Sequence, residues 1–172
     1  DFDSPPGQQE DGAIAFSPDG TQIAFVSSRE GADAEAWSTN HEVFVVPVRG
    51  GESRKVTASA GSDLTPAFAP DGTMYVRAQR RAGFEADRWY LDAYDRRTGA
   101  RRTVFQAPDL SVSAFTISKD GATLWFTAGE EGRENLFTVP AAGGTPKRVL
   151  QGGAIASLQL GAGFVVFATS TL

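Results

Sequence analysis

Cysteine is absent from the 172 residues, and the chain has only one histidine, His41, and one methionine. The absence of cysteine excludes disulfides, thiol catalysis and zinc sites built from cysteine, and a single histidine excludes a multi-histidine metal centre. No apolar run approaches the ~20 residues of a membrane-spanning helix. No segment longer than about two turns repeats apolar residues at helical spacing. The sequence therefore predicts almost no helix, no membrane span, and no resident metal or cofactor.

Excess charge of one sign is also small, because 16 Lys and Arg stand against 21 Asp and Glu, a net charge of −5. This balance argues against a general nucleic-acid binder. The apolar share of 41%, with twelve Phe and three Trp, is enough for a folded core. The first residues, with Asp1, Asp3 and Pro5, do not have the chemistry of a signal peptide. The chain can still be the mature part of an exported protein or a piece of a longer one.

Two turn patterns repeat at intervals of roughly 50 residues. The first is Phe-Ser-Pro-Asp-Gly at 16–20, which returns as Phe-Ala-Pro-Asp-Gly at 68–72 and Ile-Ser-Lys-Asp-Gly at 117–121. Proline presets φ for the second position of a type I turn, and the glycine that follows accepts a positive φ. The second pattern is Arg-Gly-Gly, Arg-Thr-Gly and Ala-Gly-Gly, at 49–51, 97–99 and 142–144. Both turns are suited to antiparallel strand connections.

Short runs rich in β-branched and aromatic residues lie between these turns and have the length of strands. The predicted strands are 13–16, 22–27, 42–48 and 53–57; then 65–68, 73–78, 89–95 and 101–105; then 113–117, 123–128, 135–140 and 146–150; and finally 155–160 and 164–169. Four strands per repeat are typical of a β-propeller blade. A β-sandwich is the alternative, but a sandwich does not need both turns at a fixed period.

We therefore expect an all-β chain, a single partial β-propeller over residues 1–172 with about three and a half four-stranded blades of roughly 50 residues. The expected blades are 13–57, 65–105, 113–150 and an incomplete one at 155–172. An open ring exposes unpaired strand edges. We expect the chain to be a fragment of a longer propeller, and two copies, with nearly seven blades together, favour a homodimer through the open edges.

Function is expected in the connections between the second and third strands of each blade, because these vary in length while the turns do not. They span 28–41, 79–88 and 129–134. Residues 77–102 hold eight arginines and four acidic residues. Glu85, Asp87 and Arg88 either contact a ligand, form a salt bridge that orders the loop, or dock on a further domain. The arginines are either a solvated surface or a face for acidic groups.

Other side chains in these loops have two interpretations as well. Trp37 and Phe84 are either packing residues between blades or ligand platforms, and His41 is either an ordinary loop residue or a titrating group. The chain has no Gly-x-Ser-x-Gly elbow, no phosphate-binding glycine loop and no calcium-loop spacing. A Ser-His-Asp triad would need His41, which has no glycine-framed serine beside it. We therefore expect no catalytic residues in this chain.

The turn at 16–20, followed by Ile-Ala-Phe at 23–25, resembles the repeats of TolB-like propellers and of the propellers in prolyl oligopeptidase-family serine peptidases. Four segments are similar to the acylaminoacyl-peptidase and dipeptidyl-peptidase-5 branch of that family: 37–40, 66–72, 83–88 and 94–99. In that family the propeller caps a C-terminal α/β-hydrolase domain, admits short peptides and holds the substrate N-terminus through acidic side chains.

The resemblance implies that Glu85 and Asp87 bind the ammonium group of a peptide, with Arg88 orienting them, since a neighbouring arginine keeps a carboxylate ionised. It implies short peptides and a hydrolase domain as partners, and a dipeptidyl or acylaminoacyl peptidase as the parent protein. The hydrolase half is missing from this chain, so activity is implied for the parent alone. The resemblance also favours a periplasmic or secreted location over a cytoplasmic one.

Two other functions fit parts of the pattern. A TolB-like propeller acting as a protein-binding module fits the repeats equally well and needs no hydrolase. A propeller lyase or glycosidase acting on acidic sugars is suggested by the arginine cluster alone.

Overall fold

The computed structural model describes residues 14–28, 38–151, 154–161 and 163–170. Within these ranges the chain forms fourteen strands and no helix. The strands belong to two compact units, Asp1–Arg102 and Thr103–Leu172, and each unit is described by itself.

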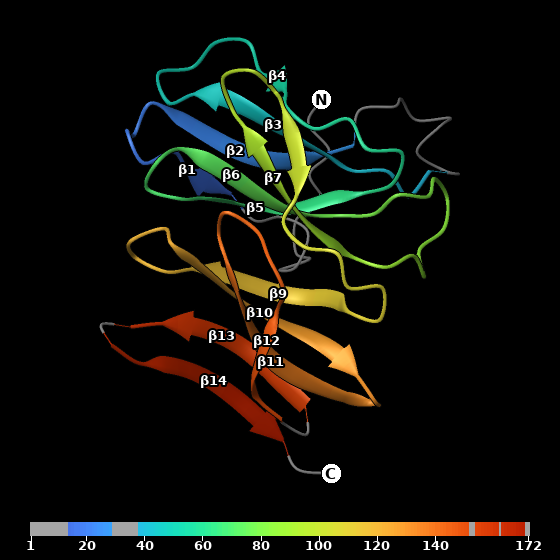
Figure 1. The fold of residues 1–172 in the computed structure, drawn as a ribbon. Helices are drawn as coiled ribbons and strands as arrows, with labels where there is room; N and C mark the ends of the chain where they lie inside the picture. The colour runs from blue at the N-terminus through green and yellow to red at the C-terminus, as the bar shows by residue number, and fades with distance from the viewer. Residues whose placement is uncertain (1–13, 29–37, 152–153, 162, 171–172) are drawn as a thin grey trace. The chain divides into compact units, whose positions relative to one another are not determined.

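The first unit holds two antiparallel four-stranded sheets whose strands follow one another in sequence order (Figure 1). We name them blade 1 (β1–β4) and blade 2 (β5–β8). Blade 1 consists of β1 Ala15–Phe16, β2 Gln22–Ser27, β3 Glu42–Pro47 and β4 Arg54–Lys55. Blade 2 consists of β5 Asp63–Phe68, β6 Thr73–Ala78, β7 Tyr90–Asp95 and β8 Arg101–Thr103.

The second unit holds a third four-stranded sheet, blade 3 (β9–β12), and a two-stranded sheet. Blade 3 consists of β9 Ser111–Ile117, β10 Thr123–Glu130, β11 Arg133–Pro140 and β12 Lys147–Leu150. The two-stranded sheet pairs β13 Ala154–Leu160 with β14 Val165–Ser170. These up-and-down sheets confirm the predicted all-β class and partial propeller. The single-domain division and the homodimer stay predictions.

The repeated turns form as their sequence predicts. Gly20, Gly72 and Gly121 have φ of 66°, 87° and 74°, the left-handed region that favours glycine. The aspartate of the turn has a further role, because the Ser17 and Ser118 hydroxyls each donate to the following aspartate over 2.6 Å. Arg96, from the β7–β8 turn, donates to Asp19 and is the main reason that the pKa of Asp19 lies below its usual value. The turn ends of blades 1 and 2 are therefore joined.

One predicted loop is wrong. The connection expected over 129–134 is only a two-residue hairpin, Glu131–Gly132, with φ of 54° and 74°. Both residues are left-handed, the geometry of a tight hairpin turn whose twist matches the flanking strands. Strands β10 and β11 therefore extend to Glu130 and from Arg133. The last connection in this series is too short to carry a binding loop.

The core of the first unit is an apolar layer between blades 1 and 2. Val26, Val43 and Val45 from blade 1 belong to one buried cluster with Met74 and Val76 from blade 2. The second unit has its own core, with an aromatic stack in which the Phe126 ring lies 4.9 Å from Phe105 and 5.3 Å from Phe137. Burial of such large side chains dominates the stability of each unit.

Candidate functional site

The β6–β7 loop, residues 79–89, is the candidate site, and the buried carboxylate of Asp87 organises it. Asp87 is 7% exposed. Its oxygens accept the backbone N–H groups of Arg80 at 2.8 Å and Arg81 at 3.0 Å, and the Arg81 Nε at 3.0 Å. Burial raises the pKa of Asp87, but these hydrogen bonds outweigh burial and hold the pKa below its usual value. The carboxylate is therefore ionised and fully used within the loop.

A second buried side chain, that of Gln79 at the end of β6, also holds the loop in place. Gln79 is 3% exposed, and its Nε2 donates to the backbone carbonyl groups of Glu85 at 3.0 Å and Asp87 at 2.9 Å. The Gly61 backbone lies against Gln79, where a Cβ atom would come within 2.8 Å of the Gln79 Cβ. Asp87 and Gln79 together fix the backbone of the loop, and this backbone positions the exposed side chains that the loop carries.

Glu85, the second predicted acid, is exposed. No hydrogen bond or ion pair from the described part of the chain reaches its carboxylate. Arg88 stacks its guanidinium 4.1 Å from the centroid of the Tyr90 ring, and Arg80 lies 4.3 Å from the same centroid. The salt bridge that orders the loop therefore joins Asp87 to Arg81, whereas the Arg88 guanidinium stacks on Tyr90.

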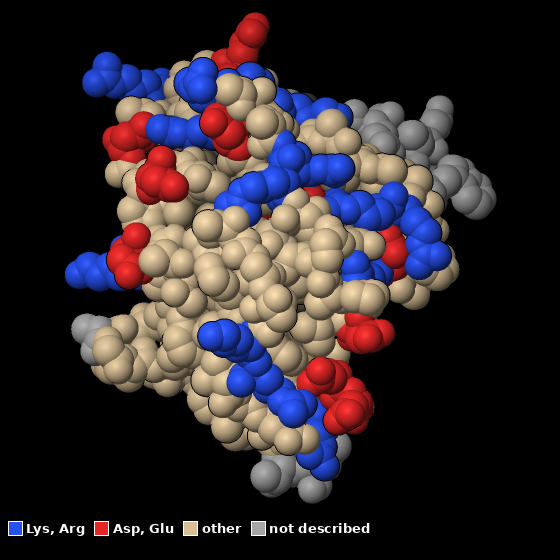
Figure 2. All heavy atoms as spheres, viewed as in Figure 1, with Lys and Arg blue, Asp and Glu red and all other residues tan. Residues whose placement is uncertain are grey.

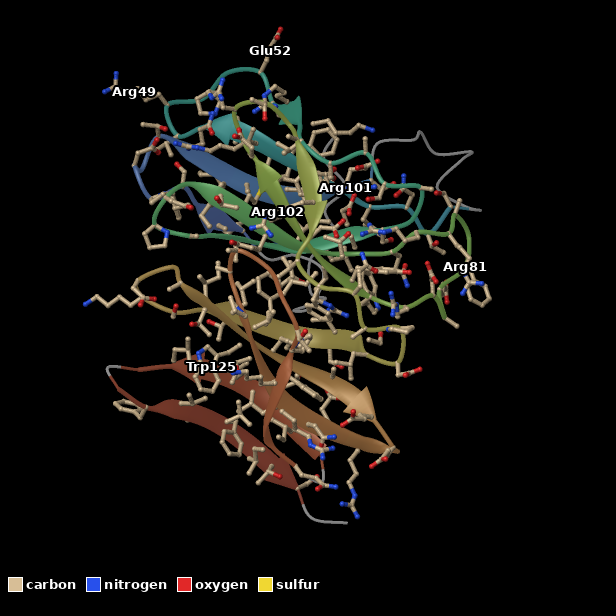
Figure 3. All side chains as sticks on the ribbon, in the orientation of Figure 1. Arg49, Glu52, Arg81, Arg101, Arg102 and Trp125 are labelled. Atoms are coloured by element: carbon tan, nitrogen blue, oxygen red, sulfur yellow. The ribbon has the colours of Figure 1, made fainter. Side chains whose placement is uncertain are left out.

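The sequence also singled out two aromatic residues of the loops, Phe84 and Trp37. Phe84 is 43% exposed and lies under the Arg81 guanidinium, 4.0 Å from its ring centroid. It is therefore a surface residue rather than a buried packing residue. Trp37 lies outside the described residues. Figure 3 labels Arg81 on this loop, beyond the ends of β6 and β7.

A buried polar network that the sequence analysis missed lies between blades 1 and 2. Asp63 and Asp92 are both 0% exposed. Ser59 donates to Asp63 through its hydroxyl at 3.0 Å and its backbone N–H at 3.3 Å. Burial, together with the nearby Glu42 carboxylate, raises the pKa of Asp63 to about 7. Asp63 is therefore partly protonated near neutral pH.

This network connects to the candidate site. Asp92 accepts a hydrogen bond from Arg80 Nη2 at 2.7 Å, and Arg80 is also the first residue whose N–H binds Asp87. The Asp63 N–H donates to the His41 carbonyl at 2.7 Å, so the end of the β2–β3 connection is tied to the start of β5. His41 serves here through its backbone. The loop thus rests on the blade 1–blade 2 junction.

The outermost strand of each blade carries two consecutive basic residues, a repeat that the sequence analysis also missed. The pairs are Arg54–Lys55, Arg101–Arg102 and Lys147–Arg148. One member of each pair reaches an acid of its own blade, in Lys55–Glu42 at 3.2 Å, Arg101–Asp92 at 3.9 Å and Arg148–Glu130 at 2.8 Å. Basic side chains appear in blue in Figure 2. Charged side chains on edge strands oppose pairing with other chains, and Arg101 and Arg102 of the predicted arginine cluster lie on such a strand.

In the second unit, a hollow of about 1150 Å³ lies between the β9–β10 turn and the β13–β14 turn. Its walls include Trp125 and the 60%-exposed Phe164. Asp120, which also lines it, accepts the Ser118 hydroxyl that helps keep its pKa low. Across the part of the chain that the structure describes, no three His, Asp or Glu side chains are placed to bind a metal, and no helix could span a membrane.

Comparisons with known proteins agree with this fold. No family model matches the chain. It is 29% identical over 141 residues to a dipeptidyl-peptidase 5 of Porphyromonas gingivalis, covering 81% of this chain and 21% of that protein. It resembles the crystal structure of puromycin hydrolase with a TM-score of 0.71 and 16% identity, over 92% of this chain and 25% of that one. It also resembles a putative TolB from Agrobacterium tumefaciens, with a TM-score of 0.66 and 12% identity, over 86% and 52%.

The chain thus spans about a fifth of the length of the curated peptidase that it matches. The sequence similarity confirms the resemblance to the propeller portion of a prolyl oligopeptidase-family serine peptidase, and the structural similarities show the propeller fold.

Proposed function

We propose that this chain is the propeller portion of a serine exopeptidase and that its β6–β7 loop binds the N-terminus of short peptides for an α/β-hydrolase domain. The observation that carries the proposal is the contrast between two carboxylates of one loop. Asp87 is buried and holds the loop, whereas Glu85 is exposed and has no partner among the described side chains. An exposed carboxylate on a fixed loop is suited to a peptide ammonium.

The three residues then have distinct roles. Glu85 contacts the ammonium group. Asp87 is a positioning residue, because its carboxylate is consumed by Arg80 and Arg81. Arg88, stacked on Tyr90, orders the end of the loop. In the parent protein the surrounding blades would restrict access so that short peptides reach the loop and folded proteins do not.

Peptide binding to the chain tests this proposal. A tripeptide with a free amine is titrated against its N-acetylated form, followed by NMR chemical shifts of the loop amides. We expect the free amine to bind more tightly, and we expect Glu85→Gln to abolish that preference. Glu52→Gln serves as the matched control, because it changes an exposed glutamate in the β3–β4 turn of blade 1, which Figure 3 labels well away from Arg81 of the candidate loop. Equal binding of both peptides, or an unchanged preference in Glu85→Gln, contradicts the proposal.

The fold similarity to TolB supports a second candidate, a propeller that binds another protein. This candidate leaves the loop carboxylates without a role. A pull-down that recovers one stoichiometric protein partner, with no effect of Glu85→Gln on that partner, would favour it over peptide binding.

A further inference from the structure

Three contacts, two with Asp87 and one with Phe84, hold Arg81 in place, but the side chain keeps hydrogen-bond donors that these contacts do not use. Its backbone N–H and its Nε both bind Asp87, at 3.0 Å each, and its guanidinium stacks on Phe84 at 4.0 Å. The side chain is nevertheless 62% exposed. No partner from the described residues reaches its two terminal amino groups. Arg81 therefore presents a fixed guanidinium to solvent.

A fixed guanidinium is different from an ordinary surface arginine. A mobile arginine loses rotamer entropy when it binds, whereas a side chain already fixed by a salt bridge and an aromatic ring has less to lose. Guanidinium donors match the geometry of a carboxylate better than an ammonium does. Asp87 occupies the Nε edge of Arg81, so the donors that remain are those of the terminal amino groups.

The charge of the loop also indicates a carboxylate ligand. Residues 79–88 carry three arginines against Glu85 and Asp87, which leaves the loop net positive. A ligand that offers only an ammonium group is attracted by Glu85 but repelled by the arginines. A ligand that adds a carboxylate satisfies both signs.

We propose that Arg81 is a specificity-determining residue that binds a carboxylate of the peptide. The substrates are then short peptides that carry a carboxylate close to the N-terminus, either as an acidic side chain or as the C-terminus of a very short peptide. This inference rests on the proposed function for its peptide ligand, with Glu85 holding the ammonium. Asp87 and Phe84 act through Arg81 as positioning residues.

The test uses N-acetylated peptides, which remove the ammonium contact at Glu85 and isolate Arg81. Acetyl-Ala-Glu-Ala-amide is compared with acetyl-Ala-Gln-Ala-amide, and acetyl-Ala-Ala-Ala with its C-terminal amide, by titration calorimetry of the chain. We expect the carboxylate form to bind about tenfold more tightly in at least one pair, as suits a charge-assisted bidentate contact. The pair that discriminates identifies the source of the carboxylate.

Arg81→Gln should remove this discrimination, and Arg81→Lys should restore part of it, since lysine keeps the charge but loses the fork. Arg97→Gln is the control, an exposed arginine in the β7–β8 turn at the other end of blade 2. Equal binding within both pairs, or discrimination that persists in Arg81→Gln, overturns the inference. Failure of Glu85→Gln to affect free-amine peptides refutes the ammonium site alone and leaves this result standing.

Discussion

Replacement of Asp63 by asparagine should make the protein more stable at alkaline pH and leave its stability unchanged in acid. Asp63 is fully buried at the junction of blades 1 and 2, with Ser59 donating two hydrogen bonds to it. Its pKa is raised from 3.8 to about 7. Asparagine has the shape and neutrality of the protonated carboxyl group. Its oxygen can accept the Ser59 N–H, and its NH2 group can donate to the Ser59 hydroxyl, so both contacts of Asp63 with Ser59 keep a partner.

The size of the effect follows from proton linkage. The pKa of Asp63 is higher in the folded than in the unfolded chain. The stabilisation that protonated Asp63 contributes to folding is therefore complete below about pH 4 and is lost as the pH rises through about 7. A shift of about three pKa units, at ~1.4 kcal/mol each, corresponds to a loss on the order of 4 kcal/mol by about pH 8. Between these limits folding takes up about one proton, so the free energy of unfolding falls by about 1.4 kcal/mol for each pH unit.

Urea unfolding of the original chain and of Asp63→Asn at several pH values between about 4 and 8 measures this slope. The difference between the two proteins isolates Asp63, because other groups titrate in both. Asp71→Asn, an exposed residue of the β5–β6 turn, controls for the loss of one carboxylate. A difference that does not change with pH, or an asparagine variant that becomes relatively less stable as the pH rises, would show that Asp63 folds in its ionised form and would refute the reasoning.

Three further changes test other parts of the structure. Asp87→Ala removes the acceptor of the loop and should cost about 2–3 kcal/mol in urea unfolding, and a loss below about 0.5 kcal/mol would contradict its positioning role. Gly61→Ala places a Cβ 2.8 Å from the Gln79 Cβ, so the melting temperature should fall and the loop amides should shift in NMR spectra; unchanged spectra would contradict the close contact. Phe126→Ala removes the centre of the aromatic stack and should cost about 3–5 kcal/mol, which calorimetry measures, and a variant of near-original stability would contradict that core.

The strands were predictable because the signals that define them are local. Strands β2 and β6 begin and end where the sequence predicts, since each follows a turn whose proline, aspartate and glycine fix the backbone. The Glu131–Gly132 hairpin was not predictable in the same way, because a glutamate in the left-handed region has no sequence signal. The pairing of β10 with β11 brings Glu130 opposite Arg133 and leaves only Glu131 and Gly132 to make the turn. Glu131 must therefore adopt the left-handed conformation.

The sequence predicts the loop that forms the candidate site, but it does not predict which side chains of the loop contact one another. The sequence places Asp87 beside Arg88, so Arg88 is the natural partner by proximity. The structure selects Arg81 instead, because the loop turns back on itself and returns Arg81 to the carboxylate. The network around Asp63 depends on contacts between segments far apart in the chain, such as the hydrogen bond of 3.3 Å from Arg101 Nη1 on β8 to the Ser59 hydroxyl in the β4–β5 connection, 42 residues away. No local pattern encodes such a contact.

Glu85 and Asp87 are two residues apart, and in a strand both side chains would face the same side. A tight turn, in which the Asp87 N–H donates to the Phe84 carbonyl at 2.9 Å, separates them. One carboxylate is therefore committed to the loop, and the other remains at the surface. Since Asp87 positions both the backbone that carries Glu85 and the guanidinium of Arg81, its loss should weaken binding of ammonium and carboxylate together. Changes at Glu85 or Arg81 should each affect one of the two.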